Sequence, residues 1–422
     1  MKKILSLYIL LVVVLTSFAG DTLKIMQYNL LYYDKITQWC SEANNSVERK
    51  NEYLKTITSH YKPDIFTVNE MNGSSQSTDK LLNNVFNTNG LSNYKRAEYT
   101  GSYIVNMLYY NSEKLALKSQ SYILTSPRIT DVYQLYYKSD NLQNTDTVFI
   151  TCMVMHLKAG SNSSDASKRE TSSEQIMSYI QNYGIKGNVF LMGDFNVYTS
   201  SEKAFQNFLQ PTSPGVQLVD PVNALGKWHD NANFSAYHTQ STHTESGCPS
   251  SGGMDDRFDF ILASKPVMQG SMGVIYVNNS YWAFGQDGNR LDGSLIDEPT
   301  NTSLPPAVIN ALYNMSDHLP VVMSIYADTG LLSSSTIDTN STQIIDFVNP
   351  VNDSLTLRYK GQMDAKVSVS LINQNGSVVL NSKTAMSPNG TYYYNVQGLP
   401  SGVYILKVKS KHINFSNKIV KL

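Results

Sequence analysis

Five short polar signatures follow apolar stretches of this chain, in the order Tyr28–Leu30, Asn69–Glu70, Met155–Leu157, Gly193–Asn196 and Ser316–His318. A sixth, Arg257–Phe260, places the carboxylate of Asp259 inside an apolar stretch, where a buried charge is costly unless it has a partner. Ligands of layered α/β proteins bind beyond the ends of strands. The six signatures therefore predict one site that combines carboxylates, histidines and amides.

Each signature taken alone also has a structural explanation. Asn29 can satisfy backbone groups in a turn, and Glu70 can begin a loop or cap a helix. A lone His156 is more often a hydrogen-bonded structural histidine than a catalyst. Gly193 and Asp194 suit a turn, and the dipeptide at 317–318 is common. The prediction of a site depends on the complete ordered set.

The elements that must carry these signatures alternate between strands and helices from Leu23 to about Asp328, which predicts a layered α/β domain. Val148–His156 is apolar at almost every position, as expected of a strand covered on both faces. The other strands are predicted at Leu23–Leu30, Asp64–Val68, Asn188–Met192, Arg257–Ala263 and Val321–Tyr326, and helices at Ser46–Tyr61 and Ser173–Tyr183.

The ordered set resembles the endonuclease/exonuclease/phosphatase superfamily, which includes pancreatic-type deoxyribonucleases, sphingomyelinases and inositol polyphosphate 5-phosphatases. Its most specific segments here are Phe190–Asn196 and Met315–Pro320. The resemblance implies a four-layer α/β sandwich, with two packed β-sheets flanked by helices. Asn69 stands where the superfamily usually has Gln. The segments 157–160, 228–229, 238–242 and 252–257 look like a secreted bacterial branch.

The resemblance also implies a metal site. Glu70 would bind a divalent cation, with Asn29 and Asp317 nearby. Oxygen ligands without thiolates favour a hard ion, so we expect Mg²⁺, with Mn²⁺ or Ca²⁺ as alternatives. The number of ions, one or two, stays open.

The remaining signatures receive catalytic roles from the same resemblance. Asp194 would orient or deprotonate the attacking water, and Asn196, expected to point the same way in an extended segment, would bind phosphoryl oxygens. His318 would lie against the scissile phosphate, with Asp259 holding its tautomer. His156 would stabilise charge or protonate the leaving oxygen.

Two further residues are candidates for substrate binding. Arg169 is suited to neutralising a phosphate or to forming a structural ion pair. His238 belongs to a loop that we expect to border the site. Together with His229 and His243 it suggests a second metal site, although the irregular spacing favours surface-loop histidines.

Charge divides the chain into two modules. Residues 343–422 contain nine Lys and Arg against three Asp and Glu, a net charge of +6. Residues 4–342 contain 22 against 31, a net charge of −9. The near balance over all 422 residues excludes a histone-like basic binder, and three cysteines exclude a disulfide-dense miniprotein and a Cys-rich zinc module.

The ends of the chain predict export. Lys2, Lys3 and the apolar run Ile4–Phe18 predict a signal peptide over residues 1–19, because a spanning helix needs ~20 apolar residues. An uncleaved anchor is the alternative. We expect no transmembrane segment in the mature chain, a catalytic domain over residues 20–328 and a linker over 329–342.

Residues 343–422 predict a small all-β, Ig-like sandwich, because short alternating strands are separated by turns. The segments Asp346–Val351, Gly398–Tyr404 and Lys418–Leu422 resemble the C-terminal sorting domain of type IX secretion cargo. This implies passage across the inner and outer membranes of a Gram-negative bacterium, to the medium or the cell surface, through the type IX secretion machinery. A carbohydrate- or partner-binding module is the alternative.

Cysteine pairing is left open by the sequence. Cys152 lies in a buried strand and is expected to be a free apolar filler. Cys40 and Cys248 fall in polar loops, and export exposes them to an oxidising compartment, so the sequence allows either a disulfide between them or two free thiols.

We therefore expect a monomeric, secreted, metal-dependent phosphodiester hydrolase, since no P-loop, Gly-x-Ser-x-Gly or His-Glu-x-x-His motif competes. A nuclease of low sequence specificity is the leading prediction. A phosphoesterase for a small or lipid-linked phosphoester, as in the sphingomyelinase and inositol-phosphatase branches, is the alternative, and a non-catalytic surface binding protein is a third. The acidic body argues against a long duplex-binding groove, because duplex affinity grows with the number of phosphates neutralised by Lys and Arg.

Overall fold

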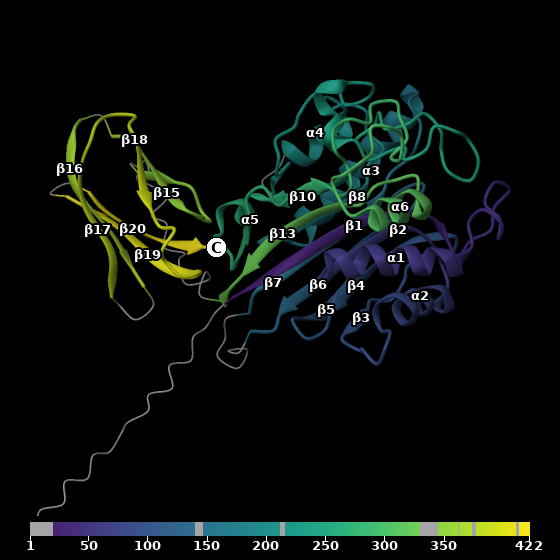
Figure 1. Ribbon diagram of the computed structural model, residues 1–422, viewed down its shortest axis with the longest axis horizontal. Helices are drawn as coiled ribbons and strands as arrows, with labels where there is room; N and C mark the ends of the chain where they lie inside the picture. Colours follow the sequence, from purple (N-terminus) through teal and green to yellow (C-terminus); the bar gives the residue numbers. More distant parts are fainter. Residues whose placement is uncertain are drawn as a thin grey trace, which may run out of the picture.

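A computed structural model describes residues 20–139, 147–211, 216–329, 345–361, 363–373, 377–410 and 413–422. Figure 1 shows an α/β body, coloured purple to green, and an all-β tail in yellow. The predicted signal peptide and all of the predicted linker except residue 329 lie outside the described residues.

The body is built from short strands and a few helices. Its strands are β1 (Asp21–Tyr33), β2 (Ile65–Asn72), β3 (Tyr94–Arg96), β4 (Ile104–Asn111), β5 (Leu115–Ile123), β6 (Thr130–Tyr137), β7 (Phe149–His156), β8 (Asn188–Asp194), β9 (Leu218–Val219), β10 (Asp259–Ser264), β11 (Val274–Tyr276), β12 (Trp282–Ala283) and β13 (Val321–Ala327). Its helices are α1 (Val47–Tyr61), α2 (Ser75–Leu81), η1 (Leu82–Phe86), α3 (Ser163–Asn182), α4 (Lys203–Leu209), η3 (Ala232–Tyr237), α5 (Lys265–Gln269) and α6 (Pro306–Met315).

The strands form two sheets. A seven-stranded sheet has the order β11-β13-β1-β2-β4-β3, with β12 beside β13, and a six-stranded sheet has the order β5-β6-β7-β8-β10-β9. Each sheet contains one parallel pair near its centre, β1 with β2 and β7 with β8. The register of these pairs places Asn29 opposite Asn69 and His156 opposite Asp194. Polar residues of neighbouring strands therefore lie at the same level.

Alternation along the strands explains the layers. In β1, Ile25 packs into the core between the two sheets, whereas the next residue, Met26, packs with residues of α1 and α6 on the outer face. In β8, Met192 faces the core between the sheets and Leu191 packs under α3 and α4. Helices thus cover both outer faces, as the ribbon in Figure 1 also shows, and the expected four-layer sandwich is confirmed.

Several element boundaries differ from the sequence-based prediction. Strand β2 continues past Val68 to Asn72, so Glu70 lies inside a strand and not in a loop. Helix α3 begins at Ser163, ten residues before the predicted start, because Asn162 caps it by accepting the backbone N–H of Asp165 at 2.9 Å. Strand β10 begins at Asp259, which leaves Arg257 outside it.

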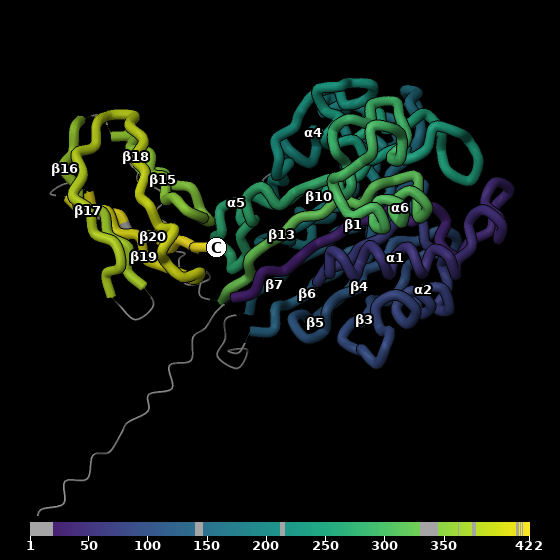
Figure 2. The backbone as a smooth tube through the Cα atoms, viewed as in Figure 1, coloured from purple at the N-terminus to yellow at the C-terminus, as the bar shows by residue number. Residues whose placement is uncertain are grey.

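The tail consists of two small sheets, which confirms the predicted β-sandwich. Its strands are β14 (Ile345–Phe347), β15 (Ser354–Tyr359), β16 (Ala365–Ile372), β17 (Val378–Met386), β18 (Thr391–Asn395), β19 (Gly402–Lys409) and β20 (Asn414–Lys421). They pair in the orders β14-β15-β18 and β17-β16-β19-β20, and their buried residues form a core of their own. Figure 2 shows the backbone of this tail in yellow, beside the body. In the part of the chain that the structure describes, every helix is too short or too polar to cross a membrane.

The cysteines divide into a pair and a single thiol. Cys40 and Cys248 form a disulfide across 208 residues of sequence, which settles the pairing that the sequence left open. Cys152 is free and fully buried in β7, as expected. The disulfide joins the segment after β1 to the loop before β10, and this loop contributes contacts to the site described next.

Candidate active site

Asp194, at the end of β8, lies where the polar ends of both sheets meet. Its Oδ2 atom accepts a hydrogen bond from Asn29 Nδ2 at 3.1 Å. The same oxygen lies 3.4 Å from His156 Nε2 and 3.9 Å from His318 Nε2. Asn29 lies in β1 of the seven-stranded sheet, and His318 lies in the segment that leads into β13 of the same sheet. His156 and Asp194 belong to the six-stranded sheet. The predicted convergence of these signatures is therefore present.

Glu70 reaches the same place through an irregularity in β2. Its φ of 58° lies in the left-handed region, and the pairing of β2 with β4 shifts register between Val68 and Met71. Such a bulge turns a side chain that regular pleating would direct elsewhere. The carboxylate accepts hydrogen bonds from Asn29 Nδ2 and from the backbone N–H of Tyr32, each at 3.3 Å.

Asn196 follows Asp194 but does not continue the strand. Its φ is 52°, and its backbone N–H donates to Asp194 Oδ1 at 3.0 Å. The expectation of an extended segment here is wrong, because this turn directs the backbone back onto the Asp194 carboxylate. The Asn196 side chain donates to the carbonyl of Leu157 at 3.3 Å and is almost fully buried.

Asp259 and His318 form the pair that the buried carboxylate required. His318 Nδ1 lies 2.7 Å from Asp259 Oδ2, and Thr239 Oγ1 donates to the same oxygen at 2.8 Å. On the other side of the ring, His318 Nε2 lies 2.7 Å from Gln240 Nε2. Asp259 is fully buried, so its side chain reaches the reacting groups only through the imidazole.

The site separates its two histidines electrostatically. Burial alone would lower the pKa of His318, but the carboxylates of Asp259, Asp317 and Asp194 outweigh it and hold that pKa well above its usual range. Burial, with the positive charges of Arg128 and His318, holds the pKa of His156 well below its usual range. At neutral pH, His318 is therefore the cationic histidine and His156 the neutral one.

The pKa values of two carboxyl groups in the site, Asp194 and Glu70, are both raised. Burial raises the pKa of Asp194 to about 7, with Asp259 and Glu70 adding to the shift and His318 opposing it. Burial also raises the pKa of Glu70, and the charge of Asp317 raises it further. A concentration of buried negative charge of this kind is typical of functional sites.

Glu70 and Asp317 fit a divalent cation. Among the described residues, no Lys or Arg side chain forms an ion pair with either carboxylate within 4.0 Å. Asp317 Oδ2 accepts the backbone N–H of Ser250 at 2.9 Å, which holds the carboxylate in place. Two carboxylates that repel one another, with no Lys or Arg among the described residues in ion-pair contact with either, offer the oxygen ligands that Mg²⁺ or Ca²⁺ prefers.

Asn29 lies among the acidic groups. Its Oδ1 atom accepts the backbone N–H of Leu31 at 3.1 Å, and its Nδ2 group faces Glu70, Asp194 and His318. In this arrangement Asn29 is a hydrogen-bond donor to the acidic groups. Its Oδ1 atom keeps a second lone pair, so the role of metal ligand stays a prediction.

Comparison with known families identifies both modules. Residues 26–318 match the Endonuclease/Exonuclease/phosphatase family. The chain belongs to this family. Its members are phosphoester hydrolases that generally depend on a divalent metal ion, and this chain is accordingly a hydrolase of phosphoester bonds. Residues 347–422 match the secretion system C-terminal sorting domain, which indicates export by type IX secretion or attachment at the cell surface.

Solved structures of the family resemble this chain at low identity. The catalytic domain of human Nocturnin with bound sulfate is 14% identical, with a TM-score of 0.45, over 73% of this chain and 98% of that one. A family protein from Bacteroides thetaiotaomicron is 12% identical, with a TM-score of 0.45, over 73% and 99%. A mannosyl-6-phosphatase from the same bacterium is 14% identical, with a TM-score of 0.43, over 72% and 99%. No curated protein matches the chain.

Both candidate substrate-binding residues of this family member are buried in structural contacts. Arg169 is 1% exposed, bonds Glu202 through Nε at 2.9 Å and donates to the carbonyls of Lys158 and Gly160. His238 is fully buried between the carbonyls of Trp228 and Met254. Both predictions are corrected, since neither side chain has a surface that a substrate could contact.

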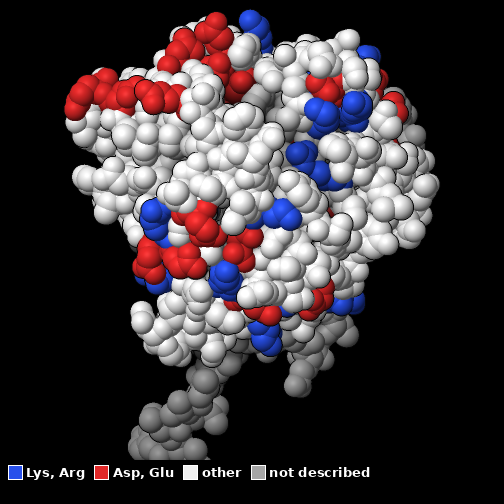
Figure 3. All heavy atoms as spheres, turned by 90° about the vertical axis from the view of Figure 1, so that its right-hand side faces the viewer, with Lys and Arg blue, Asp and Glu red and all other residues white. Residues whose placement is uncertain are grey.

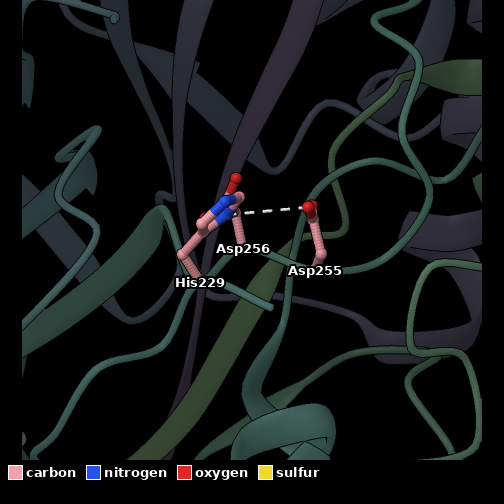
Figure 4. Close-up of side chains that lie close together, drawn as sticks. All are labelled: His229, Asp255 and Asp256. Carbon is pink, nitrogen blue, oxygen red and sulfur yellow. Dashed lines mark hydrogen bonds and ion pairs between the residues drawn. The ribbon is translucent and has the colours of Figure 1, made fainter. Parts of the chain in front are cut away.

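A second acidic group consists of His229, Asp255 and Asp256, whose side chains are drawn in Figure 4. His229 Nδ1 lies 3.0 Å from Asp256 Oδ1 and 3.6 Å from Asp255 Oδ2. Within the described ranges, this is the only place where three such ligand atoms lie within 4.8 Å of one another. Of the three histidines weighed for a second metal site, only His229 belongs to this group, because His243 stacks on Tyr313.

Sequence reasoning missed three residues that hold the site. Asn69, noted only as a departure from the usual Gln, accepts the backbone N–H of Asp194 at 3.0 Å and donates to the carbonyl of Met155 at 3.1 Å. It thereby ties together the strands of Glu70, His156 and Asp194. Lys50 lies on the buried stripe of α1 and donates to the carbonyls of Leu30 and Leu31. Gln240 contacts His318.

Proposed function

We propose that this protein is an exported, divalent-metal-dependent phosphodiesterase, and that it acts as a nuclease of low sequence specificity. The observation that carries the proposal is the convergence of three residues around one buried acidic centre: Glu70 from β2, Asp194 from the end of β8, and His318 from the segment before β13. Such a centre combines a cation site, a proton acceptor and a positively charged hydrogen-bond donor. Hydrolysis of a phosphodiester by water needs these three functions.

The residues divide the work by charge. Mg²⁺ held by Glu70 and Asp317 would offset the negative charge that develops on the phosphoryl oxygens. Asp194 accepts a proton from the attacking water, and a pKa of about 7 suits a base at neutral pH. Asn196 retains one amide N–H for a phosphoryl oxygen after donating the other to Leu157.

The two histidines act from opposite sides of the acidic centre. His318, held by Asp259 and kept protonated, binds the phosphate as a cation. His156 stays neutral and donates a hydrogen bond from Nε2, which stabilises charge on the phosphate or on the leaving oxygen. Since a neutral imidazole is a poor proton donor, we assign charge stabilisation to His156 in preference to proton transfer.

The surface favours short substrates over long duplexes. On the face drawn in Figure 3, most side chains are uncharged, and Lys and Arg form small separate groups without a continuous basic band. Residues 4–342 carry a net charge of −9. Weak, salt-sensitive binding of nucleic acid is expected from so few phosphate contacts. The same feature favours the second candidate, a phosphoesterase for a small or lipid-linked phosphoester.

Metal dependence is tested on a minimal substrate. Bis-(p-nitrophenyl) phosphate is expected to be hydrolysed with Mg²⁺ and not with EDTA. Glu70→Gln removes one negative charge from the cation site, so we expect Mg²⁺ affinity to fall by ~10–100-fold and the rate to recover in part at high Mg²⁺. Calorimetry of Mg²⁺ binding measures the first effect and initial rates measure the second.

The matched control for Glu70→Gln is Glu113→Gln, in the exposed turn between β4 and β5, which should retain the wild-type Mg²⁺ affinity. Wild-type Mg²⁺ affinity in Glu70→Gln would contradict the assignment of the cation site. Folded protein without any metal-dependent turnover would favour a non-catalytic binding protein.

Parallel assays on plasmid DNA, RNA, sphingomyelin and inositol phosphates separate the two candidate substrate classes. Cleavage of either nucleic acid supports the nuclease. Turnover of sphingomyelin or an inositol phosphate, with both nucleic acids intact, would replace the nuclease by the small-phosphoester enzyme and leave the metal-dependent mechanism in place.

Export through both membranes of a Gram-negative cell is proposed to require the tail. Deleting residues 343–422 should leave a folded, active, monomeric enzyme in the periplasm, because the two modules have separate cores. The deletion removes a small apolar contact, in which Ile275 and Tyr326 of the body meet Val420 of the tail. Cell fractionation with activity assays tests this, and normal amounts of truncated enzyme in the medium would contradict it.

A further inference from the structure

A cavity of about 380 Å³ lies beside the reacting groups but is lined by none of them. Its walls are residues 100–106, residues 127–129 and Tyr32. Tyr32 connects it to Glu70 through the 3.3 Å hydrogen bond from its backbone N–H. Arg128 connects it to β7 by donating from Nη1 to the carbonyls of His156 at 3.5 Å and Leu157 at 3.0 Å. The volume is in the range of small-ligand sites, ~300–1,000 Å³.

The charge of this cavity is opposite to that of its surroundings. No Asp or Glu lines it, and Arg128 is its only charged lining residue, in a domain of strongly negative net charge. Among the described residues, Nε and Nη2 of Arg128 have no hydrogen-bond partner, whereas Nη1 is anchored to the backbone. A guanidinium fixed at one nitrogen and free at the others can bind a phosphate through two parallel hydrogen bonds.

Arg128 is close enough to the acidic centre to act on it electrostatically, since its charge lowers the pKa of Glu70 and of His156. A phosphate bound to Arg128 would therefore lie next to the scissile phosphate, but outside the set of groups that react with it.

An exposed aromatic ring completes the cavity. Tyr103 is 57% exposed, and Lys35 Nζ lies 4.5 Å from the centre of its ring. Aromatic side chains beside cationic groups bind the flat face of a base or sugar ring, independently of sequence. The hydroxyl groups of Thr100 and Ser102 also line the cavity and can donate hydrogen bonds.

We propose that this cavity is a subsite for a second phosphate of the substrate, carried on the ring next to the scissile phosphate. Arg128 binds that phosphate, and Tyr103 packs against the ring. The inference rests on the proposed phosphodiesterase function and narrows its substrate to a single nucleotide strand, because the cavity has room for one nucleotide unit but not for a duplex. Another ring that carries two phosphates, such as an inositol bisphosphate, could place the same groups in the subsite, namely a phosphate on Arg128 and a ring against Tyr103.

A matched pair of chromogenic esters tests the subsite. Both are p-nitrophenyl esters of thymidine 5′-phosphate, and only one carries a 3′-phosphate. We expect wild-type kcat/KM to favour the 3′-phosphorylated ester by ~10–100-fold, the range of hydrogen bonds between charged groups. In Arg128→Ala this ratio should fall towards one. Arg128→Lys should keep part of this ratio, because the ammonium group keeps the positive charge but lacks the two parallel N–H donors of the guanidinium.

The control substitution is Arg358→Ala, exposed on β15 in the tail, which should leave the ratio unchanged. A wild-type ratio near one, or an unchanged ratio in Arg128→Ala, would overturn the subsite. A loss of the same factor on both esters would assign Arg128 to the scissile phosphate and overturn it as well. Melting temperatures of all variants establish that they are folded.

Equilibrium binding separates the subsite from the proposed function. Calorimetry in EDTA measures the affinity of thymidine 3′,5′-bisphosphate and of thymidine 5′-phosphate for the wild type and for Arg128→Ala. The substitution should weaken binding of the bisphosphate by ~10-fold or more and leave binding of the monophosphate unchanged. Arg128-dependent binding without hydrolysis of any ester would keep the subsite and reject the hydrolase. Hydrolysis of the esters, with the same affinity for the bisphosphate in Arg128→Ala as in the wild type, would keep the hydrolase and reject the subsite. An Arg128-dependent affinity for inositol 1,4-bisphosphate over inositol 1-phosphate, with no such difference between the two thymidine phosphates, would keep the second-phosphate subsite. It would assign the subsite to an inositol substrate.

Discussion

Replacing Asp194 by asparagine is expected to lower kcat by ~10²–10⁴-fold while the protein stays folded. The substitution preserves the shape of the side chain and removes the proton acceptor at the centre of the site. Asp194 Oδ2 is the oxygen closest to His156 Nε2, at 3.4 Å, and it faces Asn29 as well. Initial rates on bis-(p-nitrophenyl) phosphate at saturating Mg²⁺ measure the effect, and circular dichroism establishes the fold.

The pH dependence gives a second readout for Asp194. Without a bound cation its pKa is raised to about 7, and a nearby divalent cation lowers that value. Since only the ionised form accepts a proton, kcat/KM of the wild type should rise with pH and level off at or below about pH 7. Activity that continues to rise beyond pH 9, or near-normal turnover in Asp194→Asn, would show that another group activates the water.

The matched control is Asp64→Asn, which makes the same change in another buried aspartate. Asp64 lies directly before the first residue of β2, Ile65, at the end of this strand that is far from Glu70. Asp64 pairs with Lys114 at 3.2 Å and accepts a hydrogen bond from Asn111, far along the strand from Glu70. This variant should lower the melting temperature and keep the turnover. A loss of turnover equal to that of Asp194→Asn would mean that the catalytic effect arises from general destabilisation.

The convergence of the polar signatures could be predicted because they adjoin apolar stretches that indicate strands. Apolar runs such as 148–156 identify buried strands, and the parallel register of neighbouring strands then places their polar ends at one level. The partner of Asp259 was predictable for a different reason, since a carboxylate inside an apolar strand requires one. The four-layer arrangement came from the resemblance to a family and not from periodicity.

The local backbone of the site could not be predicted in this way. Glu70 and Asn196 both adopt left-handed φ values, and the register shifts that accompany the bulges depend on neighbouring strands. Strands β4, β5 and β6 carry no polar signature that would mark them in the sequence. Leu115–Ile123 carries a long run of exposed positions on one edge of its sheet, which weakens the alternation that identifies a strand.

Whether a single polar side chain is buried in structural contacts or is available to a ligand also depends on partners far away in the sequence. Arg169 has a plausible phosphate-binding chemistry, but Glu202, 33 residues further along the chain, pairs with it inside the fold. His238 is enclosed by backbone carbonyls that no sequence pattern indicates. Arg128, in contrast, carries no motif, and only the folded structure reveals that its free nitrogens line a cavity beside the site.

His318→Ala is expected to lower kcat by ~10²–10⁴-fold, because it removes the cationic group that faces the phosphate. His318 Nε2 lies 3.9 Å from Asp194 Oδ2, within the same acidic centre. The control is His60→Ala, which removes an exposed histidine in the last turn of α1 and should leave kcat unchanged. Equal rates for His318→Ala and the wild type would remove His318 from the mechanism.

Asp259→Asn distinguishes a positioning role from a merely structural one. The Asp259 carboxylate, 2.7 Å from His318 Nδ1, is the largest of the charges that raise the pKa of His318. The protonated imidazole is present below that pKa and is lost as the pH rises through it. Removing the charge lowers the pKa of His318, so the decline of kcat/KM on the alkaline side should begin at lower pH in Asp259→Asn. The loss should therefore be larger at pH 9 than at pH 6, whereas a purely structural defect would reduce kcat/KM by the same factor at both.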